Sequence, residues 1–256
     1  MIQQLARFAN DSYCLMRTPH SFSTKAGIWF NLLRPSSRVQ GFRVSYLDRP
    51  SYILLYREIF VRQHYYFRSD TDSPLIFDCG ANIGMATLFF KWLYPNARVH
   101  AFEPDPTTFR VLQGNIAANQ LSDVTAHNCA LWDENCSIPF FVHPSVQGSL
   151  RMSADASRLA DAATEISVPA ERLSDFIHGP IDLLKLDTEG AEHRILCDLV
   201  SKSKISLIRS MIIEYHHKHP AKLGGFLSML ESSGFAYRLA ATPQPEQDIM
   251  IIASRE

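Results

Sequence analysis

Short apolar runs alternate with helix-like segments along most of the chain after residue 74. The first run, 75–77, is bounded by Pro74 and Gly80, so it is too short for a helix and suits a buried strand. The predicted strands are 75–79, 98–102 and 124–129, separated by helices at 85–93 and 107–119. Such alternation predicts an α/β domain with a parallel sheet and right-handed crossovers.

The second half of the chain repeats this pattern after an irregular stretch. Extended pieces at 138–142 and 165–168 flank a polar stretch rich in alanine and serine, 149–163, which is either a lid or a surface helix. The alternation resumes with a short helix at 172–177, a strand at 181–186, a helix at 191–199, a strand at 207–214 and a helix at 223–232. Two closing strands, 236–240 and 249–253, lie close enough in sequence to form an antiparallel hairpin at a sheet edge.

Residues 1–70 lack this alternation and are rich in aromatics and arginine, so we interpret them as an accessory region preceding a main domain at 71–256. One helix is predicted within them: Asp48 or Arg49 lies near its start and Pro50 in its first turn. Its apolar face is expected to pack on the main domain. The aromatic group at 65–67 either lines a substrate mouth or belongs to the core, and core is the commoner outcome.

Composition narrows the class of protein. The chain has 256 residues, 46% of them hydrophobic and 20% charged, which are ordinary globular values. The formal net charge of −1 gives no electrostatic case for a nucleic-acid partner. Five cysteines without a CxxC pair indicate neither a disulfide framework nor a zinc site, so we expect reduced thiols and a cytoplasmic protein. The pattern shows no signal peptide and no membrane span.

The turn that follows the first strand is the first candidate for chemistry. Gly80 and Gly84 let the backbone turn tightly and approach a ligand, because neither carries a Cβ. Ligands of open α/β sheets bind beyond the carboxyl ends of the strands, so the Asp78 carboxylate is expected to face the ligand crevice. Taken alone, the turn fits a nucleotide-binding loop and a plain connection between strand and helix equally well.

Glu103 strengthens the nucleotide interpretation. It ends the second strand 25 residues after Asp78, where an acidic residue can accept hydrogen bonds from ribose hydroxyls. Pro104 stops that strand, and Asp105 with Pro106 provides an N-cap and a first-turn proline for the next helix. The alternative is that Glu103 is a solvated strand end.

The order of residues in the turn favours one ligand over another. A dinucleotide site more typically carries G-x-G-x-x-G, whereas this turn has Asp78, Gly80, Asn82 and Gly84 at alternate positions. A carboxylate at the start of the turn would repel a pyrophosphate but suits an amine or a sulfonium cation. This points to S-adenosylmethionine rather than a dinucleotide.

Several blocks together resemble the FkbM family of S-adenosylmethionine-dependent methyltransferases. They are Asp78-Cys-Gly-Ala-Asn-Ile-Gly84, Glu103-Pro104, Ala130-Leu131 and Lys185-Leu-Asp187-Thr-Glu189-Gly190-Ala-Glu192, and the resemblance spans about residues 55–215. The last block is its most specific part. The resemblance implies a mostly parallel, seven-stranded class I methyltransferase sheet with helices on both faces. It also implies methyl transfer to a hydroxyl, commonly on a sugar, a lipid-linked glycan or a natural product.

The resemblance also implies positions for the cofactor. The turn residues Asp78, Gly80, Ala81, Asn82 and Gly84 would surround its methionine end, and Glu103 with Pro104 its ribose. Asn128, Ala130 and Leu131 follow the third strand and would border the adenine, although the apolar pair suits the core as well.

The strand at 181–186 leads to a second set of candidates. Asp187 emerges at the same sheet edge as Asp78 and Glu103, and Lys185 shares its face because side chains alternate along a strand. A buried Lys–Asp pair is the structural explanation for both residues. Glu189 and Glu192 are expected in the first turn of the next helix, where the helix dipole favours carboxylates whether or not they function.

The next strand carries the acceptor-side candidates. Glu214 and His216 should lie beside Asp187, and an attacking hydroxyl must lose a proton, so a nearby base helps. We therefore assign Lys185, Asp187, Glu214 and His216 to the catalytic group, with His216 or Asp187 as the base. Asp187 is also assigned to the cofactor-binding residues. The cluster of Asp187, Glu214 and His216 is also chemically acceptable to Mg²⁺ or Mn²⁺, but its spacing matches no standard metal motif, so no metal site is predicted.

The leading hypothesis is an O-methyltransferase acting on a small-molecule or glycan acceptor. The accessory region and the 149–163 stretch would form the acceptor pocket or lid, and the aromatic N-terminal region is a candidate homodimer contact. N-methylation, a catalytically silent cofactor-binding scaffold and a nicotinamide dehydrogenase are the alternatives.

Overall fold

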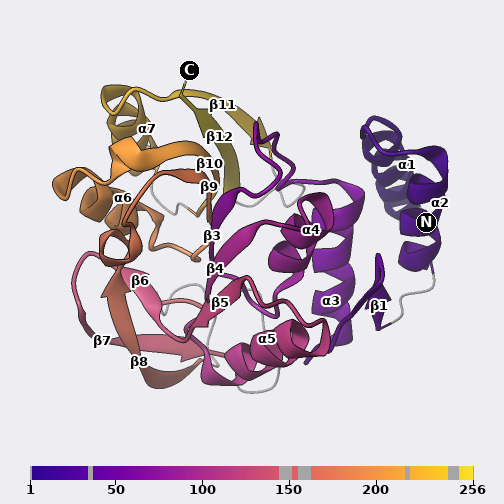
Figure 1. The fold of residues 1–256 in the computed structure, drawn as a ribbon, viewed down its shortest axis with the longest axis horizontal. Coiled ribbons are helices and arrows are strands. Elements are labelled where there is room, and N and C mark those ends of the chain that lie inside the picture. Colours follow the sequence, from indigo (N-terminus) through magenta and orange to yellow (C-terminus); the bar gives the residue numbers. More distant parts are fainter. Residues whose placement is uncertain are drawn as a thin grey trace.

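A seven-stranded sheet forms the centre of the computed structural model, which describes residues 2–33, 37–143, 152–154, 163–216, 220–241 and 248–255. Its strands follow the order β11-β12-β10-β9-β3-β4-β5 (Figure 1). They are β3 (Leu75–Cys79), β4 (Arg98–Phe102), β5 (Val124–His127), β9 (Ile181–Leu186), β10 (Ile208–His216), β11 (Ala236–Ala241) and β12 (Asp248–Ser254). The predicted α/β class and mostly parallel sheet are confirmed.

The sheet combines a parallel block with an antiparallel edge. β10, β9, β3, β4 and β5 pair in parallel, and their carboxyl ends therefore lie at one edge of the sheet. β12 pairs antiparallel with both β10 and β11, so the predicted closing hairpin is present and β11 forms the sheet's outer edge.

Helices cover both faces of this sheet. α4 (Met85–Leu93) and α5 (Pro106–Ala118) lie on one face, and α6 (Glu192–Ser201) and α7 (Pro220–Ser232) lie on the other (Figure 1). Because side chains alternate along a strand, neighbouring residues of β3 serve different cores. Ile76 packs in the cluster with α4, and Phe77 in the cluster with α6.

The accessory region is mainly helical. It contains α1 (Ile2–Met16), α2 (Phe22–Leu33), the two-stranded pair β1 (Arg38–Val39) and β2 (Phe42–Arg43), α3 (Arg49–Tyr56) and η1 (Arg57–Val61), a π-helical continuation of α3. The predicted start of α3 is confirmed, since the Asp48 carboxylate accepts a hydrogen bond from the Ser51 N–H and Pro50 lies in the first turn. The sequence predicted a helical, aromatic N-terminal extension, and α1 and α2 agree with it, although their bounds were not predicted.

The accessory region shares a hydrophobic core with the main domain. This agrees with the prediction that the apolar face of α3 packs on the main domain. Phe60 is fully buried and meets Phe89 of α4 edge to face, with ring centroids 5.3 Å apart. Asp11 of α1 accepts a hydrogen bond from Arg62, just past η1, at 2.8 Å, which ties the first helix to the same contact.

A smaller sheet lies beside the main one and was not predicted as a unit. Its strands are β6 (Ala130–Trp132), β7 (Cys136–Val142) and β8 (Thr164–Arg172), in the order β6-β8-β7. The strand predicted at 124–129 ends at His127, and the chain then enters β6. The helix predicted at 172–177 is a 3₁₀ turn, η3 (Leu173–Phe176), and a second such turn, η4 (Ile205–Leu207), precedes β10. Most of the 149–163 stretch lies outside the described residues.

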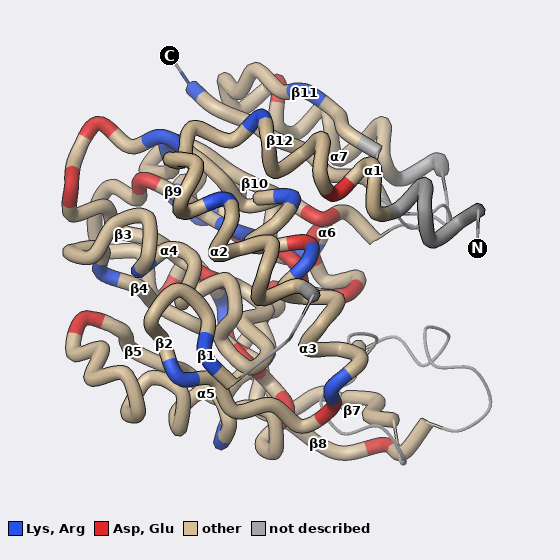
Figure 2. Tube along the Cα trace, turned by 90° about the vertical axis from the view of Figure 1, so that its right-hand side faces the viewer, with Lys and Arg blue, Asp and Glu red and all other residues tan. Residues whose placement is uncertain are grey.

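Charged residues of both signs are spread along the chain. Figure 2 shows Lys and Arg residues interleaved with Asp and Glu along the trace. Among the helices of the described segments, none is both long enough and apolar enough to span a bilayer. The absence of a nucleic-acid partner and the homodimer stay predictions.

We expect the contact between Phe60 and α4 to stabilise the whole domain rather than the accessory region alone. Phe60→Ala should lower the free energy of unfolding by about 3–5 kcal/mol in urea titrations followed by circular dichroism. The matched control is Phe30→Ala, because Phe30 is 62% exposed, and its effect should be much smaller. Equal effects of the two substitutions would contradict a shared core.

Candidate active site

The predicted site residues lie at the carboxyl ends of four parallel strands. Asp78 belongs to β3, Glu103 follows β4, Asp187 follows β9, and Glu214 is near the end of β10. Because these strands are neighbours in the sheet, the side chains converge on one edge, as the sequence pattern implied.

The turn after β3 is held in a left-handed conformation that fits its glycines. Gly80 has φ +82° and Gly84 has φ +91°, and Asn82 between them has φ +50°. A Cβ at Gly80 would overlap the carbonyl oxygen of Asp187, so only glycine fits there. The backbone of this turn therefore lies close to the end of β9, whereas the sequence pattern predicted close approach to a ligand.

Asp78 lies beneath the turn, which differs from the expectation that its carboxylate faces the ligand crevice. The residue is fully buried, accepts a hydrogen bond from Thr87 of α4 at 2.7 Å, and lies 3.2 Å from the Lys185 ammonium. Lys185 on the adjacent strand draws the carboxylate into the protein. Lys185 also pairs with Asp187, as the sequence pattern had suggested, so it pairs with two carboxylates.

Lys185 joins three parts of the site. Its ammonium donates a 2.7 Å hydrogen bond to the Gly80 carbonyl and lies 3.5 Å from Asp187 Oδ2. Burial alone would lower the pKa of Lys185, but the Asp78 and Asp187 carboxylates raise it above the ordinary value. Lys185 is therefore a permanent cation whose partners are all internal to the protein.

Glu103 is placed to present its carboxylate to a ligand at the turn. It accepts hydrogen bonds from the backbone N–H groups of Asn82 and Asp105, both at 2.9 Å. Each carboxylate oxygen accepts more than one hydrogen bond, so capacity remains for ribose hydroxyls. Burial raises the pKa of Glu103 to about 8.

The residues predicted to border the adenine fall into two groups. Asn128 donates hydrogen bonds to the carbonyls of Glu103 and Pro104, so it fixes the segment that follows β4. Ala130 and Leu131 are buried in the apolar clusters of the small and main sheets. This burial agrees with the alternative interpretation, in which Ala130 and Leu131 are core residues.

Tyr65 brings the acceptor-side carboxylates together. Its hydroxyl donates to Asp187 Oδ2 at 3.0 Å and to Glu214 Oε2 at 3.3 Å, and the Lys185 ammonium lies 5.2 Å from its ring centroid. Sequence reasoning favoured core packing for the aromatic group that contains Tyr65. The residue is indeed buried, and its hydroxyl also contacts two predicted site residues.

The two carboxyl groups next to Tyr65 are electrostatically coupled. Burial, and then the charge of Asp187, raise the pKa of Glu214 to about 8. Burial and the same two carboxylates raise the pKa of Tyr65 well above its ordinary value, so it stays a neutral donor. The phenol therefore screens two acidic groups that would otherwise repel each other.

Glu192 organises the loop that connects β9 to α6. Its buried Oε1 accepts hydrogen bonds from the N–H groups of Thr188 and Gly190, at 3.0 and 3.1 Å, and lies 3.1 Å from His216 Nδ1. Glu192 is in the first turn of α6, as predicted. Glu189 is not: it precedes the helix and has φ +56°.

His216 lies among carboxylates rather than in open solvent. Its side chain is 2% exposed, and its Nε2 is 3.8 Å from Asp187 Oδ1 and 3.7 Å from Glu189 Oε2. Burial alone would lower the pKa of His216, but Glu189, Glu192 and Asp187 raise it well above the ordinary value. The imidazole is accordingly charged at neutral pH unless another cation replaces its proton.

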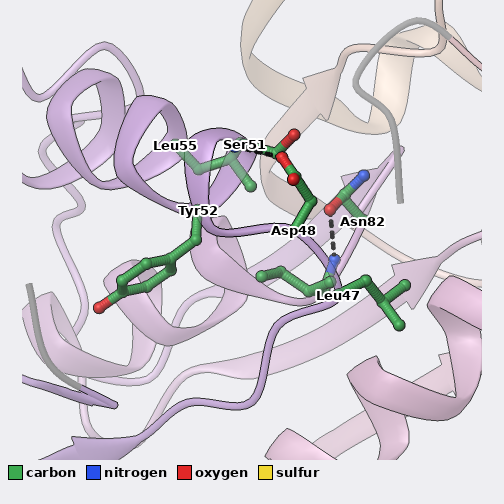
Figure 3. A pocket seen from close by; sticks show the side chains of 7 residues that line it. Leu47, Asp48, Ser51, Tyr52, Leu55 and Asn82 are labelled. Atoms are coloured by element: carbon green, nitrogen blue, oxygen red, sulfur yellow. Dashed lines mark hydrogen bonds between the residues drawn. The ribbon is translucent and has the colours of Figure 1, made fainter. Parts of the chain in front are cut away.

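A small pocket links the accessory region to the turn after β3 (Figure 3). Its lining comes from the residues just before α3, from α3 itself and from the turn: Leu47, Asp48, Ser51, Tyr52, Leu55, Asn82 and Ile83. Both Asp48, which caps α3, and Asn82, which accepts a hydrogen bond from the Ile83 N–H, line the pocket (Figure 3). The accessory region therefore borders the glycine turn directly.

The fold and the site define a class I methyltransferase. A parallel sheet closed by an antiparallel hairpin, a glycine turn after β3 and an acidic residue after β4 all have the places that this class requires. A model of the FkbM methyltransferase domain matches residues 78–237, so the chain belongs to the FkbM methyltransferase family.

Relatives support this placement over most of the chain. Methyltransferase 1 from Beauveria bassiana is 31% identical, covering 78% of this chain and 89% of its own. The 31-O-demethyl-FK506 methyltransferase FkbM from Streptomyces tacrolimicus is 30% identical, covering 76% and 86%. The crystal structure of an FkbM methyltransferase from Methylobacillus flagellatus shares the fold, with a TM-score of 0.52, 18% identity and coverage of 89% of this chain and 58% of that one.

The family, the fold and the methyl donor predicted from the sequence are thereby confirmed. The protein is a methyltransferase, and S-adenosylmethionine is its cofactor. The alternative of a nicotinamide dehydrogenase is excluded by membership of this family.

We expect Glu103 to control cofactor affinity and its pH dependence. Glu103→Ala should weaken binding of S-adenosylhomocysteine about tenfold to a hundredfold in calorimetric titrations, because hydrogen bonds to a charged group are lost. Ribose hydroxyls favour the ionised carboxylate, so wild-type affinity should rise with pH up to about 8 and then level off. Glu134→Ala, at an exposed position, is the control. A pH profile identical in Glu103→Ala and wild type would refute the assignment.

We expect Glu214 to make the folded state less stable as pH rises. Its pKa is raised from 4.5 to about 8 on folding, so the stabilisation it gives is complete below pH 4.5 and is lost as pH rises through 8. Glu214→Gln removes this loss. Its free energy of unfolding relative to wild type should increase by about 2 kcal/mol or more between pH 5 and pH 9, since one pKa unit is about 1.4 kcal/mol. Glu165→Gln, in an exposed part of β8, should show no such trend.

Proposed function

We propose that this methyltransferase acts on a hydroxyl group of a sugar, a glycan or a natural product. The observation that carries the proposal is the pair of carboxyl groups, Asp187 and Glu214, held by one tyrosine hydroxyl where the strands end. An alcohol is a weak nucleophile until its proton is removed, so an acidic pair of this kind suits oxygen as the acceptor atom. The name of the Streptomyces relative, a 31-O-demethyl-FK506 methyltransferase, supports the same acceptor chemistry.

The cofactor would lie across the glycine turn. Gly80, Ala81, Asn82 and Gly84 would surround its methionine end, with Asp78 acting from beneath by holding Lys185. Glu103 would accept the ribose hydroxyls, with Asn128 fixing Glu103 and Pro104 in place. Alignment of the acceptor oxygen with the methyl group would supply much of the rate.

Asp187 is the proposed base. Its side chain is 23% exposed, whereas that of His216 is 2% exposed, so an acceptor reaches the aspartate more readily. His216 also carries its own proton among three carboxylates, which leaves it unable to take another. His216 and Lys185 are therefore positioning residues that hold Asp187, and Glu214 shares the proton of the Tyr65 hydroxyl.

The accessory region is proposed to complete the acceptor side. Residues 1–70 supply Tyr65 to the carboxylate pair and border the glycine turn through Asp48, which supports a role in acceptor binding. Ser153 donates a hydrogen bond to the Glu189 carbonyl, so one described residue of the 149–163 stretch reaches the same site. A homodimer contact through the aromatic N-terminal helices is a further proposal for this region.

Two other functions compete with this one. An N-methyltransferase needs no base to activate a neutral amine, and a silent cofactor-binding scaffold needs no acceptor-side group at all. The experiment that separates the three offers panels of hydroxylated and amine-bearing acceptors with methyl-labelled S-adenosylmethionine, followed by NMR location of the methyl group. Label on oxygen is expected. Label on nitrogen, or tight cofactor binding without transfer to any panel member, would overturn the proposal.

Substitutions should separate catalysis from cofactor binding. Asp187→Asn should lower kcat about a hundredfold or more, because general-base catalysis is worth about 10²–10⁴-fold, and His216→Ala should lower it to a smaller extent. S-adenosylhomocysteine affinity should change little in either variant. Asp70→Asn is the matched control, since the Asp70 side chain is 93% exposed. Unchanged turnover in both site variants would show that neither residue serves the acceptor.

A further inference from the structure

Three side chains beside the proposed base form a compact set of metal-ligating atoms. Asp187, Glu189 and His216 each offer one such atom, and these atoms all lie within 4.8 Å of one another. His216 Nε2 is 3.8 Å from Asp187 Oδ1 and 3.7 Å from Glu189 Oε2. The sequence pattern had suggested Asp187, Glu214 and His216 as possible ligands. In the structure, Glu214 faces Tyr65, and Glu189 completes the set instead.

The three atoms are close enough to reach one cation after small side-chain movements. Ligands of an octahedral ion at about 2.1 Å lie about 3.0 Å apart when adjacent. The two distances from His216, 3.8 and 3.7 Å, are longer than this. Both carboxylates must therefore turn toward His216 for one ion to contact all three atoms.

The imidazole is oriented from its far side. His216 Nδ1 lies 3.1 Å from Glu192 Oε1, and the Glu192 side chain is 1% exposed. A buried carboxylate that binds one ring nitrogen directs the other nitrogen outward and fixes the ring, which is the usual environment of a histidine that ligates a metal. Here the outward nitrogen points between Asp187 and Glu189.

The same glutamate prepares the loop that carries the two acidic ligands. Glu192 Oε1 accepts hydrogen bonds from the N–H groups of Thr188 and Gly190, which lie on either side of Glu189. The carboxylates are thus placed by the protein itself, so little ordering cost would accompany binding of a cation.

Among the described residues, two cations lie beside the cluster, Lys185 and His216. Lys185 lies 3.5 Å from Asp187 Oδ2, the oxygen bonded to Tyr65, and so serves the other side of that carboxylate. Asp187 Oδ1, Glu189 and Glu192 therefore share His216 between them. A divalent ion in place of the imidazole proton would balance them better.

We propose that Asp187, Glu189 and His216 bind one divalent transition-metal cation such as Mn²⁺, with Glu192 as the residue that orients His216. Two carboxylate oxygens and one imidazole nitrogen suit Mn²⁺ better than Mg²⁺, which prefers oxygen alone. Three protein ligands leave coordination positions open. Only if the proposed O-methylation is correct would an acceptor oxygen occupy one of them, where the ion would favour loss of its proton.

The test measures cation binding directly and needs no acceptor. The metal-free full chain is titrated with MnCl₂, and free Mn²⁺ is followed by electron paramagnetic resonance. One site per chain is expected, and pulsed spectra of the bound ion should show coupling to one imidazole nitrogen. Glu189→Gln and His216→Ala should each weaken binding tenfold or more, and the nitrogen coupling should disappear in His216→Ala.

Controls distinguish this site from incidental binding and from the proposed reaction. Glu134→Gln removes an exposed carboxylate and should leave Mn²⁺ affinity unchanged, and S-adenosylhomocysteine binding reports that each variant is folded. Absence of Mn²⁺ binding, or bound Mn²⁺ without nitrogen coupling in the wild type, would overturn the proposal. Preference for Zn²⁺ in competition would change the metal but keep the site. Because no methyl transfer is measured, the cation site and the O-methylation stand or fall separately.

Discussion

The active-site edge depends on one buried ammonium group. Lys185 is 2% exposed, yet it lies within 3.5 Å of two carboxylates and donates to the carbonyl of Gly80, so the cost of removing it from water is offset on three sides. These contacts join the glycine turn after β3 to the end of β9. Without the ammonium, Asp78 would be a fully buried carboxylate with no cation beside it among the described residues. The position of the cofactor turn and that of Asp187 are therefore set together.

Asp187 divides its two oxygens between two environments. Oδ2 meets Tyr65 and Lys185, and Oδ1 faces His216. On the first side, the Lys185 ammonium balances the charge and the neutral Tyr65 phenol donates a hydrogen bond. On the second side, charge is balanced by an imidazole shared among several acidic groups. One carboxylate therefore contacts both the group that holds the glycine turn and the cluster around His216.

Features that depend on a few adjacent residues could be predicted from the sequence. Contacts between residues far apart in the chain could not. The turn at Gly80, the cap at Asp48 and the acid at Glu103 follow from the chemistry of a few adjacent residues, and the structure has them where they were predicted. Tyr65 could not be assigned to the site, because its hydroxyl meets residues 122 and 149 positions away. Asp78 appeared to face a ligand because nothing in the sequence shows that Lys185 lies beside it. The small sheet was hidden for the same reason, since β6 and β8 are paired across about 40 residues.

The place of β12 has a consequence for how the protein is made. This strand, Asp248–Ser254, lies between β10 and β11, although it is the last of the three to be synthesised. A ribosome extends the chain from its N-terminus, so the main-chain groups of β10 stay unpaired on that side until the final strand emerges. Open strand edges recruit other chains. The yield of folded protein in a cell should therefore depend on protection of the open edge of β10 during synthesis. It should depend less on the stability of the finished domain.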